Sequence, residues 1–201
     1  MSVAGIILAA GESRRMGFPK ALLPYGQETF LDTLIGLFIT RCTPVIVVLG
    51  AGAERIRREA LRPAVFVINA DYEHGMTTSL ECGLRAVPAE AEGVLFTLVD
   101  HPAVSASTLD ALLEAPRPLL RVPRYGGERG HPIWFSRALI PEFLAIPVGG
   151  AANAVVRRHR AATEFLDLDD PGIVADIDDP AAYRNLTGQP AAVPPLPGTR
   201  P

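Results

Sequence analysis

A loop that follows the first apolar run of the chain gathers cationic side chains around glycine. The segment from Leu8 to Lys20 reads LAAGESRRMGFPK and contains Arg14 and Arg15 besides the lysine. Glycine lets a backbone approach a ligand closely, and successive free N–H groups bind anions. Arginine forks and a lysine ammonium neutralise phosphate charge. The loop therefore favours a polyphosphate ligand, although a merely solvated basic loop would have the same composition.

The spacing of this loop excludes two common phosphate-binding motifs. Gly11 and Gly17 lie one residue too far apart for a P-loop, and no Gly-Lys-Ser or Gly-Lys-Thr follows them. The Gly-x-Gly-x-x-Gly fingerprint of dinucleotide-binding enzymes is also absent. A dehydrogenase is therefore a distant alternative.

Aspartates stand at the ends of two segments in positions where a carboxylate needs a partner. Asp100 ends the apolar run GVLFTLV, and desolvating an unpaired carboxylate there is costly. Asp100 has two alternative roles: it caps the next turn, or it binds a hard cation beside substrate phosphates. Magnesium prefers such a combination of a few carboxylates with phosphate oxygens. In the later stretch DIDDP, alternation predicts Asp176 and Asp178 on one face of a short strand, with Asp179 starting the final helix. A capped, solvated acidic turn is the alternative reading of that stretch.

Two further turns carry polar groups that suit a binding site. Gly75 precedes three hydroxyl residues, the last of which is Ser79, where a helix is expected to begin. An ordinary helix N-terminus has the same residue types. The second turn contains Arg129, Gly130 and His131. A single histidine in a turn is more often structural or exposed than catalytic.

The elements that must position these residues alternate between apolar strands and helices. Strands are expected at Val3–Ala9, Pro44–Leu49, Ala64–Ile68, Gly93–Val99, Leu119–Val122 and Pro132–Phe135. Helices are expected at Phe30–Thr40, Ala51–Leu61, Thr77–Val87, Ser107–Leu113, Arg137–Ala145 and Ala151–Arg158. Apolar strands separated by helices predict a Rossmann-like three-layer α/β/α fold with a mostly parallel sheet. Ligands of such sheets bind beyond the carboxyl ends of the strands, which is where the loops described above begin.

Composition narrows the range of functions. The chain has 201 residues, of which 48% are hydrophobic, and a formal net charge of −3. This charge argues against nucleic acid or an anionic membrane as the main partner. The two cysteines, Cys42 and Cys82, lack metal-binding spacing, so a reduced, cytoplasmic setting is expected. We expect one domain over residues 1–187 and a disordered, proline-rich tail over residues 188–201.

Four stretches, in this order, resemble those of one enzyme superfamily. The pattern Leu-Ala-Ala-Gly-x-Ser-x-Arg-Met-Gly-x-x-Lys is similar to the nucleotide-binding signature of nucleotidyltransferases with a glycosyltransferase-A-like fold. The Ala-Ala-Gly form, Gly-Met-x-x-Ser-Leu-x-x-Gly-Leu and Gly-His-Pro resemble the molybdenum cofactor cytidylyltransferases. His101 departs from that family, which commonly has Gln or Met after the aspartate. The resemblance covers approximately residues 3–186.

The resemblance implies a role for each candidate residue. It implies that Arg15, Lys20 and Asp100 are catalytic. The residues that it assigns to nucleotide binding are Ala9, Ala10, Gly11, Ser13, Arg14, Arg15, Lys20, Gly75 and Ser79, with Ser79 beside the pyrimidine. The metal ligands would be Asp100 with Asp176 or Asp178, and acceptor contacts would come from Arg129, Gly130 and His131.

The implied reaction is Mg²⁺-dependent transfer of CMP from CTP to the phosphate of molybdenum-molybdopterin, with release of pyrophosphate. The product would pass to a molybdoenzyme client. Two alternatives remain open from the sequence: another cytidylyl or sugar-phosphate nucleotidyltransferase on the same fold, and a non-catalytic chaperone that binds nucleotide or molybdenum cofactor.

Overall fold

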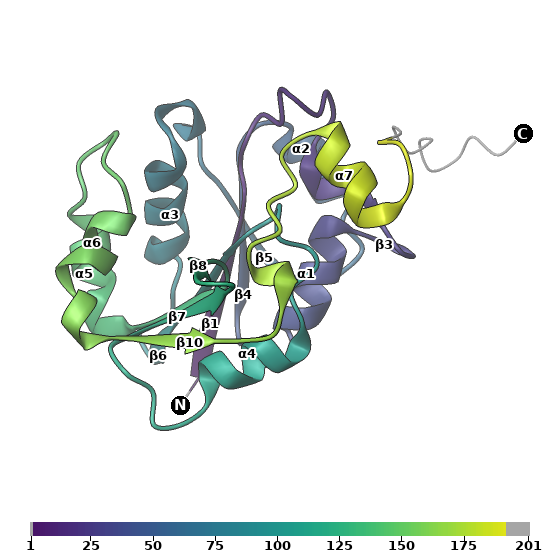
Figure 1. Cartoon of the computed structure of the whole chain (residues 1–201). Helices are drawn as coiled ribbons and strands as arrows, with labels where there is room; N and C mark the ends of the chain where they lie inside the picture. Colours follow the sequence, from purple (N-terminus) through teal and green to yellow (C-terminus); the bar gives the residue numbers. More distant parts are fainter. Residues whose placement is uncertain (1, 192–201) are drawn as a thin grey trace, which may run out of the picture.

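The computed structural model describes residues 2–191, and one mixed β-sheet runs through its centre (Figure 1). The strand order is β10-β7-β9-β6-β1-β4-β5, with β8 paired to β7. The strands of this sheet are β1 (Ser2–Ala9), β4 (Val45–Leu49), β5 (Val65–Ile68), β6 (Ala91–Leu98), β7 (Leu120–Tyr125), β8 (Glu128–Arg129), β9 (Ile133–Ser136) and β10 (Thr163–Asp167). A separate hairpin pairs β2 (Pro24–Tyr25) with β3 (Glu28–Thr29).

The centre of the sheet is parallel and apolar on both faces. Strand β1 lies between β4 and β6 and is parallel to both. Successive side chains of a strand point to opposite faces, so Val3 and Ile7 pack into one core cluster while Ala4 and Ile6 pack into the other. Because both faces are covered, the strand is a continuous apolar run rather than an alternating one.

Helices cover each face of the sheet and complete three layers (Figure 1). Helices α3, α5 and α6 contribute to one core cluster, and α1, α2, α4 and α7 contribute to the other. The α-helices are α1 (Phe30–Phe38), α2 (Ala53–Glu59), α3 (Met76–Arg85), α4 (Ala106–Leu113), α5 (Ile140–Leu144), α6 (Asn153–Arg158) and α7 (Pro180–Thr187). The short 3₁₀ segments are η1 (Lys20–Leu22), η2 (Tyr72–His74), η3 (Arg137–Leu139), η4 (Arg160–Ala162) and η5 (Pro171–Ile173). The predicted three-layer fold with a mostly parallel sheet is confirmed.

Two expectations about the second half of the chain were incomplete or wrong. Strand β10 was not predicted, because its sequence TEFLD has charged residues between half-buried apolar ones and lies at the sheet edge. The strand expected around Asp176 and Asp178 is absent, since that segment has no regular structure. Asp179 does start the final helix, where its side chain accepts hydrogen bonds from the backbone N–H groups of Ala181 and Ala182.

The final helix ends in a glycine cap. Helix α7 ends at Thr187, and Gly188 follows with a φ of 71°, a left-handed conformation that favours glycine. Most of the predicted tail, residues 192–201, lies outside the described residues. Within residues 2–191, no helix combines the length and the apolar character needed to cross a bilayer.

Candidate functional site

The loop after β1 is folded back on itself around Ser13. This residue has a φ of 53°, which is unusual outside glycine. Its carbonyl oxygen accepts hydrogen bonds from the N–H groups of Met16 and Gly17, both at 3.0 Å. Its hydroxyl accepts one from the N–H of Lys20, also at 3.0 Å. Ser13 therefore shapes the loop and brings the lysine back to the end of the strand.

The loops after β1 and β6 leave the sheet side by side. The N–H of Val99 donates to the carbonyl oxygen of Leu8 at 3.0 Å, so Asp100 lies next to the start of the first loop. The N–H of Ile177 donates to the carbonyl oxygen of Asp100 at 3.0 Å and ties in the segment before α7. Residues far apart in sequence thus meet at the carboxyl edge of the parallel strands, where such sheets bind ligands.

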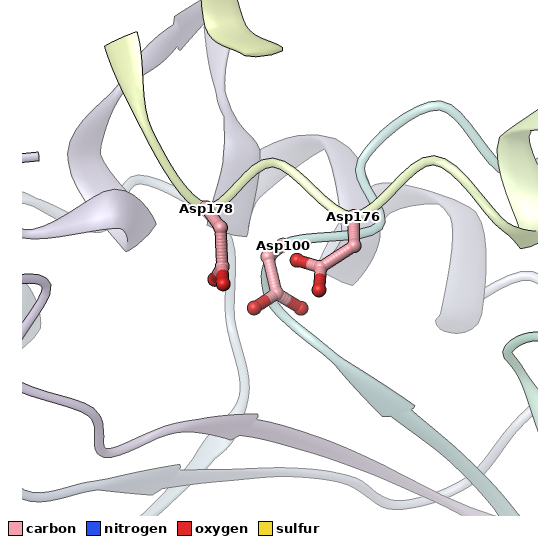
Figure 2. A group of neighbouring side chains, drawn as sticks. All are labelled: Asp100, Asp176 and Asp178. Carbon is pink, nitrogen blue, oxygen red and sulfur yellow. The ribbon is translucent and has the colours of Figure 1, made fainter. Parts of the chain in front are cut away.

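Three carboxylates converge at this edge. Asp100 comes from the loop after β6, and Asp176 and Asp178 come from the segment between η5 and α7, with their side chains directed towards it (Figure 2). One oxygen of each lies within 4.8 Å of one oxygen of the other two. The buried Oδ1 of Asp100 has no hydrogen-bond partner within the part of the chain that the structure describes. Oxygen donors at this spacing suit a hard divalent cation.

Cationic side chains partly balance these carboxylates. The Lys20 Nζ lies 2.7 Å from Asp100 Oδ2 and 2.7 Å from Asp178 Oδ1. Arg15 forms a further ion pair with Asp178. Burial works against the charged lysine, but the two aspartates outweigh it and raise the pKa of Lys20. The hydrogen bond from Lys20 in turn lowers the pKa of Asp178.

Asp176 behaves differently from its two neighbours. Partial desolvation, followed by repulsion from Asp100 and Asp178, raises the pKa of Asp176 to about 6. A carboxylate with a raised pKa beside two others is a site where a further positive charge would stabilise the folded protein. A bound divalent cation would supply that charge.

A cleft of about 330 Å³ opens beside the carboxylates. Eight of the residues predicted from the sequence line it: Ala9, Ala10, Gly11, Ser13, Lys20, Gly75, Ser79 and Asp100. Gly11 and Gly75 face open space, so backbone is accessible at both turns. Arg14 is placed differently: its side chain is 81% exposed and does not line the cleft, although it pairs with Glu12, which does. Arg15 is also outside that lining but reaches the carboxylates through Asp178.

Asn69 is a residue of this site that the sequence did not single out. Its Nδ2 donates to the hydroxyls of Thr78 at 2.9 Å and Ser79 at 3.0 Å, and its Oδ1 accepts from the N–H of Asp71 at 2.9 Å. The bond from Asp71 fixes which end of the amide is the oxygen, because a backbone N–H can only donate. No acceptor for the Ser79 hydroxyl proton is found within residues 2–191, so this proton is available to a ligand in the cleft.

A second pocket of about 280 Å³ adjoins the cleft, and Met76 lines both. Its polar lining includes Arg129, Gly130 and His131, the three predicted acceptor contacts. The rest is mainly apolar: Met76, Leu80, Phe96, Val122, Ile133, Phe135, Phe143, Ala152 and Val156. A Cβ on Gly130 would lie 1.8 Å from the carbonyl oxygen of Ile173, so packing alone requires glycine there.

Two histidines connect the pocket to the carboxylates. The rings of His101 and His131 have centroids 5.1 Å apart, and His101 Nε2 lies 3.9 Å from Asp100 Oδ1. Burial lowers the pKa of His131 to about 4 and also lowers the pKa of His101. Near neutral pH both rings are therefore uncharged. His131 lines the second pocket, and His101 lies between it and Asp100.

Comparison with known proteins assigns the family. A family model described as a MobA-like NTP transferase domain matches residues 5–163. Nicotine blue oxidoreductase of Paenarthrobacter nicotinovorans is 33% identical over 189 residues, which span 88% of this chain and 92% of that protein. Molybdenum cofactor cytidylyltransferase of Escherichia coli K12 is 31% identical over 178 residues, which span 87% of this chain and 90% of that protein.

Solved structures agree with this assignment. The crystal structure of Rv0371c from Mycobacterium tuberculosis H37Rv superposes with a TM-score of 0.82 at 29% identity and covers 94% of this chain and all of that one. A structure of the same protein in complex with manganese has a TM-score of 0.76 at 28% identity, with the same coverage. Together with the family model, these matches show that the chain belongs to the MobA-like NTP transferase family and is a nucleotidyltransferase.

Proposed function

We propose that this nucleotidyltransferase transfers CMP from CTP to the terminal phosphate of molybdenum-bound molybdopterin, with magnesium as its cation. The observation that carries the proposal is the convergence of Asp100, Asp176 and Asp178 with Lys20 at the mouth of a glycine-lined cleft. The relative in Escherichia coli named molybdenum cofactor cytidylyltransferase supports the choice of nucleotide and acceptor. A molybdoenzyme would receive the product.

The three carboxylates fit a magnesium ion. All offered ligands are oxygens, and the buried Oδ1 of Asp100 has no hydrogen-bond partner among residues 2–191. Magnesium binds few carboxylates together with substrate phosphates, and when bound it would neutralise charge on the phosphates. Lys20 pairs with Asp100 and Asp178, and a bound cation would favour the ionised form of Asp176, whose pKa is raised to about 6 in its absence.

The cleft offers CTP a distinct group for each of its parts. The backbone from Ala9 to Gly11 would meet the base and ribose, and Lys20 and Arg15 would neutralise the triphosphate. The Ser79 hydroxyl, which accepts from Asn69, has its proton free to donate to the base. Cytosine has acceptors at N3 and O2, whereas uracil and guanine carry an N–H in the middle of their pairing edge. A donor at Ser79 is therefore compatible with N3 or O2 of cytosine, and the choice of CTP rests on the family resemblance and the relative named above.

The reaction needs little proton transfer from the protein. A phosphate monoester carries about 1.5 to 2 negative charges near neutral pH, so an oxygen of the acceptor phosphate is already nucleophilic. It would attack the α-phosphorus of CTP, forming a new P–O bond as the bond to the β-phosphate oxygen breaks. Pyrophosphate leaves with the electron pair of that bond. The chain contributes placement and charge neutralisation, with Lys20 and Arg15 stabilising the departing pyrophosphate.

The second pocket would hold the acceptor. Met76 lines both cavities, and His131 of the pocket contacts His101 beside Asp100, so an acceptor held there would lie near the proposed metal site. The apolar walls of the pocket suit a planar ring system, and Arg129 at its rim would pair with the acceptor's phosphate. Gly130 and His131 would contact the acceptor between these two ends.

A pyrophosphate-release assay tests the proposal. The purified chain is incubated with Mg²⁺, molybdenum-molybdopterin and each of CTP, GTP, UTP and ATP in turn. We expect release with CTP that depends on the acceptor. Release with another nucleotide or only with a different phosphorylated acceptor would reassign the substrates. Nucleotide binding without release would support the chaperone alternative. An assay for reduction of nicotine blue addresses the redox activity named for the Paenarthrobacter relative, and we expect no turnover in it.

A further inference from the structure

Two of the three carboxylates lie on a segment that has almost no regular structure. Residues 170–178, here called the carboxylate strap, join β10 to α7 and contain only the short η5 (Pro171–Ile173). Asp176 and Asp178 follow that turn without a strand or helix to fix them. Their approach to Asp100 must therefore come from contacts between the strap and the rest of the fold.

Asp170 provides the most extensive of these contacts. It is buried, and its Oδ2 accepts hydrogen bonds from the Ser105 N–H at 2.9 Å and the Thr108 hydroxyl at 2.5 Å. Its Oδ1 accepts from the Gly172 N–H at 2.9 Å. Burial raises the pKa of Asp170, but these hydrogen bonds outweigh it and the net effect is a lowered pKa. The carboxylate is thus ionised near neutral pH and accepts three hydrogen bonds from groups within the protein.

Two of the three groups that Asp170 binds lie at the junction of the Asp100 loop with helix α4. Ser105 is the N-cap of α4, and its own hydroxyl accepts from the N–H of Thr108. One buried carboxylate therefore fixes both the end of the Asp100 loop and the first turn of the strap. Carboxylates that accept several N–H and O–H bonds are strong anchors because each bond is charge-assisted.

Three further contacts show how closely the strap fits between its neighbours. A Cβ on Gly172 would lie 2.2 Å from the carbonyl oxygen of Ala103, so only glycine packs against that loop. The carbonyl oxygen of Ile173 accepts from the His131 N–H at 2.8 Å. The N–H of Ile177 donates to the Asp100 carbonyl at 3.0 Å, between the two strap aspartates. The strap thus contacts both the loop that carries Asp100 and the turn that contains His131, one of the predicted acceptor contacts.

We propose that Asp170 is a positioning residue that anchors the strap so that Asp176 and Asp178 face Asp100 and form a divalent-cation site. Asp170 itself touches neither nucleotide nor cation. The inference rests on the proposed function, because it concerns the metal site assigned there. Groups that orient metal ligands through hydrogen bonds typically change metal affinity about 10- to 100-fold when substituted.

Mn²⁺ titration of the purified full chain, without nucleotide, tests the strap directly. Asp170→Asn keeps the side-chain shape but weakens two or more charge-assisted bonds, so we expect about 10- to 100-fold weaker Mn²⁺ binding. The matched control is Asp169→Asn, which removes the same charge from an exposed neighbour, and we expect its affinity to stay within about twofold of wild type. In turnover assays, raising Mg²⁺ should restore most of kcat in Asp170→Asn.

The outcomes separate this inference from the proposed function. If the wild-type chain and folded Asp170→Asn bind Mn²⁺ equally well, the strap inference is wrong while the metal site stands. If wild type binds no Mn²⁺, the proposed metal site fails and the strap role fails with it. If Asp170→Asn does not fold, Thr108→Val removes one of the three bonds and should weaken Mn²⁺ binding by a few-fold. Unchanged binding in that variant would overturn the inference.

Discussion

The cleft beside the carboxylates and the pocket behind β6, β7 and β9 meet at Met76 but have different linings. The cleft has glycine turns, a lysine and Asp100 at the ends of parallel strands. The pocket has mostly aliphatic and aromatic walls with Arg129 and His131 among them. A charged cleft with accessible backbone suits a triphosphate, a group that all nucleoside triphosphates share. An apolar pocket instead selects its ligand by shape. From this comparison we expect the chemistry in the first cavity and the choice of acceptor in the second.

The largest expected effect tests the charged side of this comparison. Replacing Asp100 with Asn removes the central carboxylate, and we expect turnover to fall at least about 100-fold, the scale of losing a main electrostatic stabiliser of the transition state. The measurement is pyrophosphate release at saturating Mg²⁺. Near-normal turnover would remove Asp100 from the reaction.

The next effect separates phosphate binding from metal binding. Lys20→Ala removes a cation that contacts Asp100 and Asp178. We expect kcat/KM for CTP to fall about 10- to 100-fold, consistent with losing one charge-assisted contact. The affinity for Mn²⁺ should stay unchanged or increase, because the carboxylates lose a positively charged neighbour. If Mn²⁺ binding weakens as much as CTP turnover, Lys20 acts on the metal site and not on the triphosphate.

A smaller effect should appear on the apolar side. Ala152 lines the pocket, whereas its neighbour Ala151 is exposed. Ala152→Phe should raise the acceptor KM about tenfold by filling space, on the scale of a few methylenes in an apolar pocket. CTP and Mn²⁺ binding should not change. Ala151→Phe is the matched control, and an equal effect in both variants would argue against the pocket as the acceptor site.

The smallest effect concerns stability and pH. The pKa of Asp176 is raised in the folded chain to about 6 from an ordinary value of 3.8, so the folded state holds its proton more tightly than the unfolded state. Ionisation of Asp176 therefore lowers the free energy of unfolding progressively as pH rises from about 4 to 6, and the loss persists at higher pH. Because Asp176 is exposed and solvent screens its charge, we expect this loss in the free energy of unfolding to be less than about 1 kcal/mol.

Thermal unfolding of metal-free Asp176→Asn measures this loss. The variant should melt about 1–4 °C above wild type at pH 7.5, with the difference vanishing near pH 4. Added Mg²⁺ should raise the melting temperature of wild type more than that of the variant. A variant that is less stable than wild type at pH 7.5 without metal would contradict the assigned repulsion.

Much of the charged cavity could be predicted from the sequence, because apolar runs put the loops at strand ends and the family resemblance assigned binding roles to residues that could otherwise cap turns or face solvent. The parallel strands and the convergence of Lys20 and Asp100 followed from apolar runs and loop order. Asn69 and Asp170 could not be found this way, since polar residues in turns are usually caps and nothing local reveals distant partners. The apolar pocket was equally hidden, because residues such as Phe96 and Val156 look identical whether they line a pocket or fill a core.

Diffraction from a crystal grown with Mn²⁺ and a non-hydrolysable CTP analogue tests the central assignment most directly. Anomalous scattering locates the manganese independently of the protein density. We predict one manganese peak bound by Asp100 and by Asp176 or Asp178, with the triphosphate beside Lys20 and the cytosine next to Ser79. Manganese and nucleotide bound elsewhere, with these side chains unoccupied by either, would contradict the account.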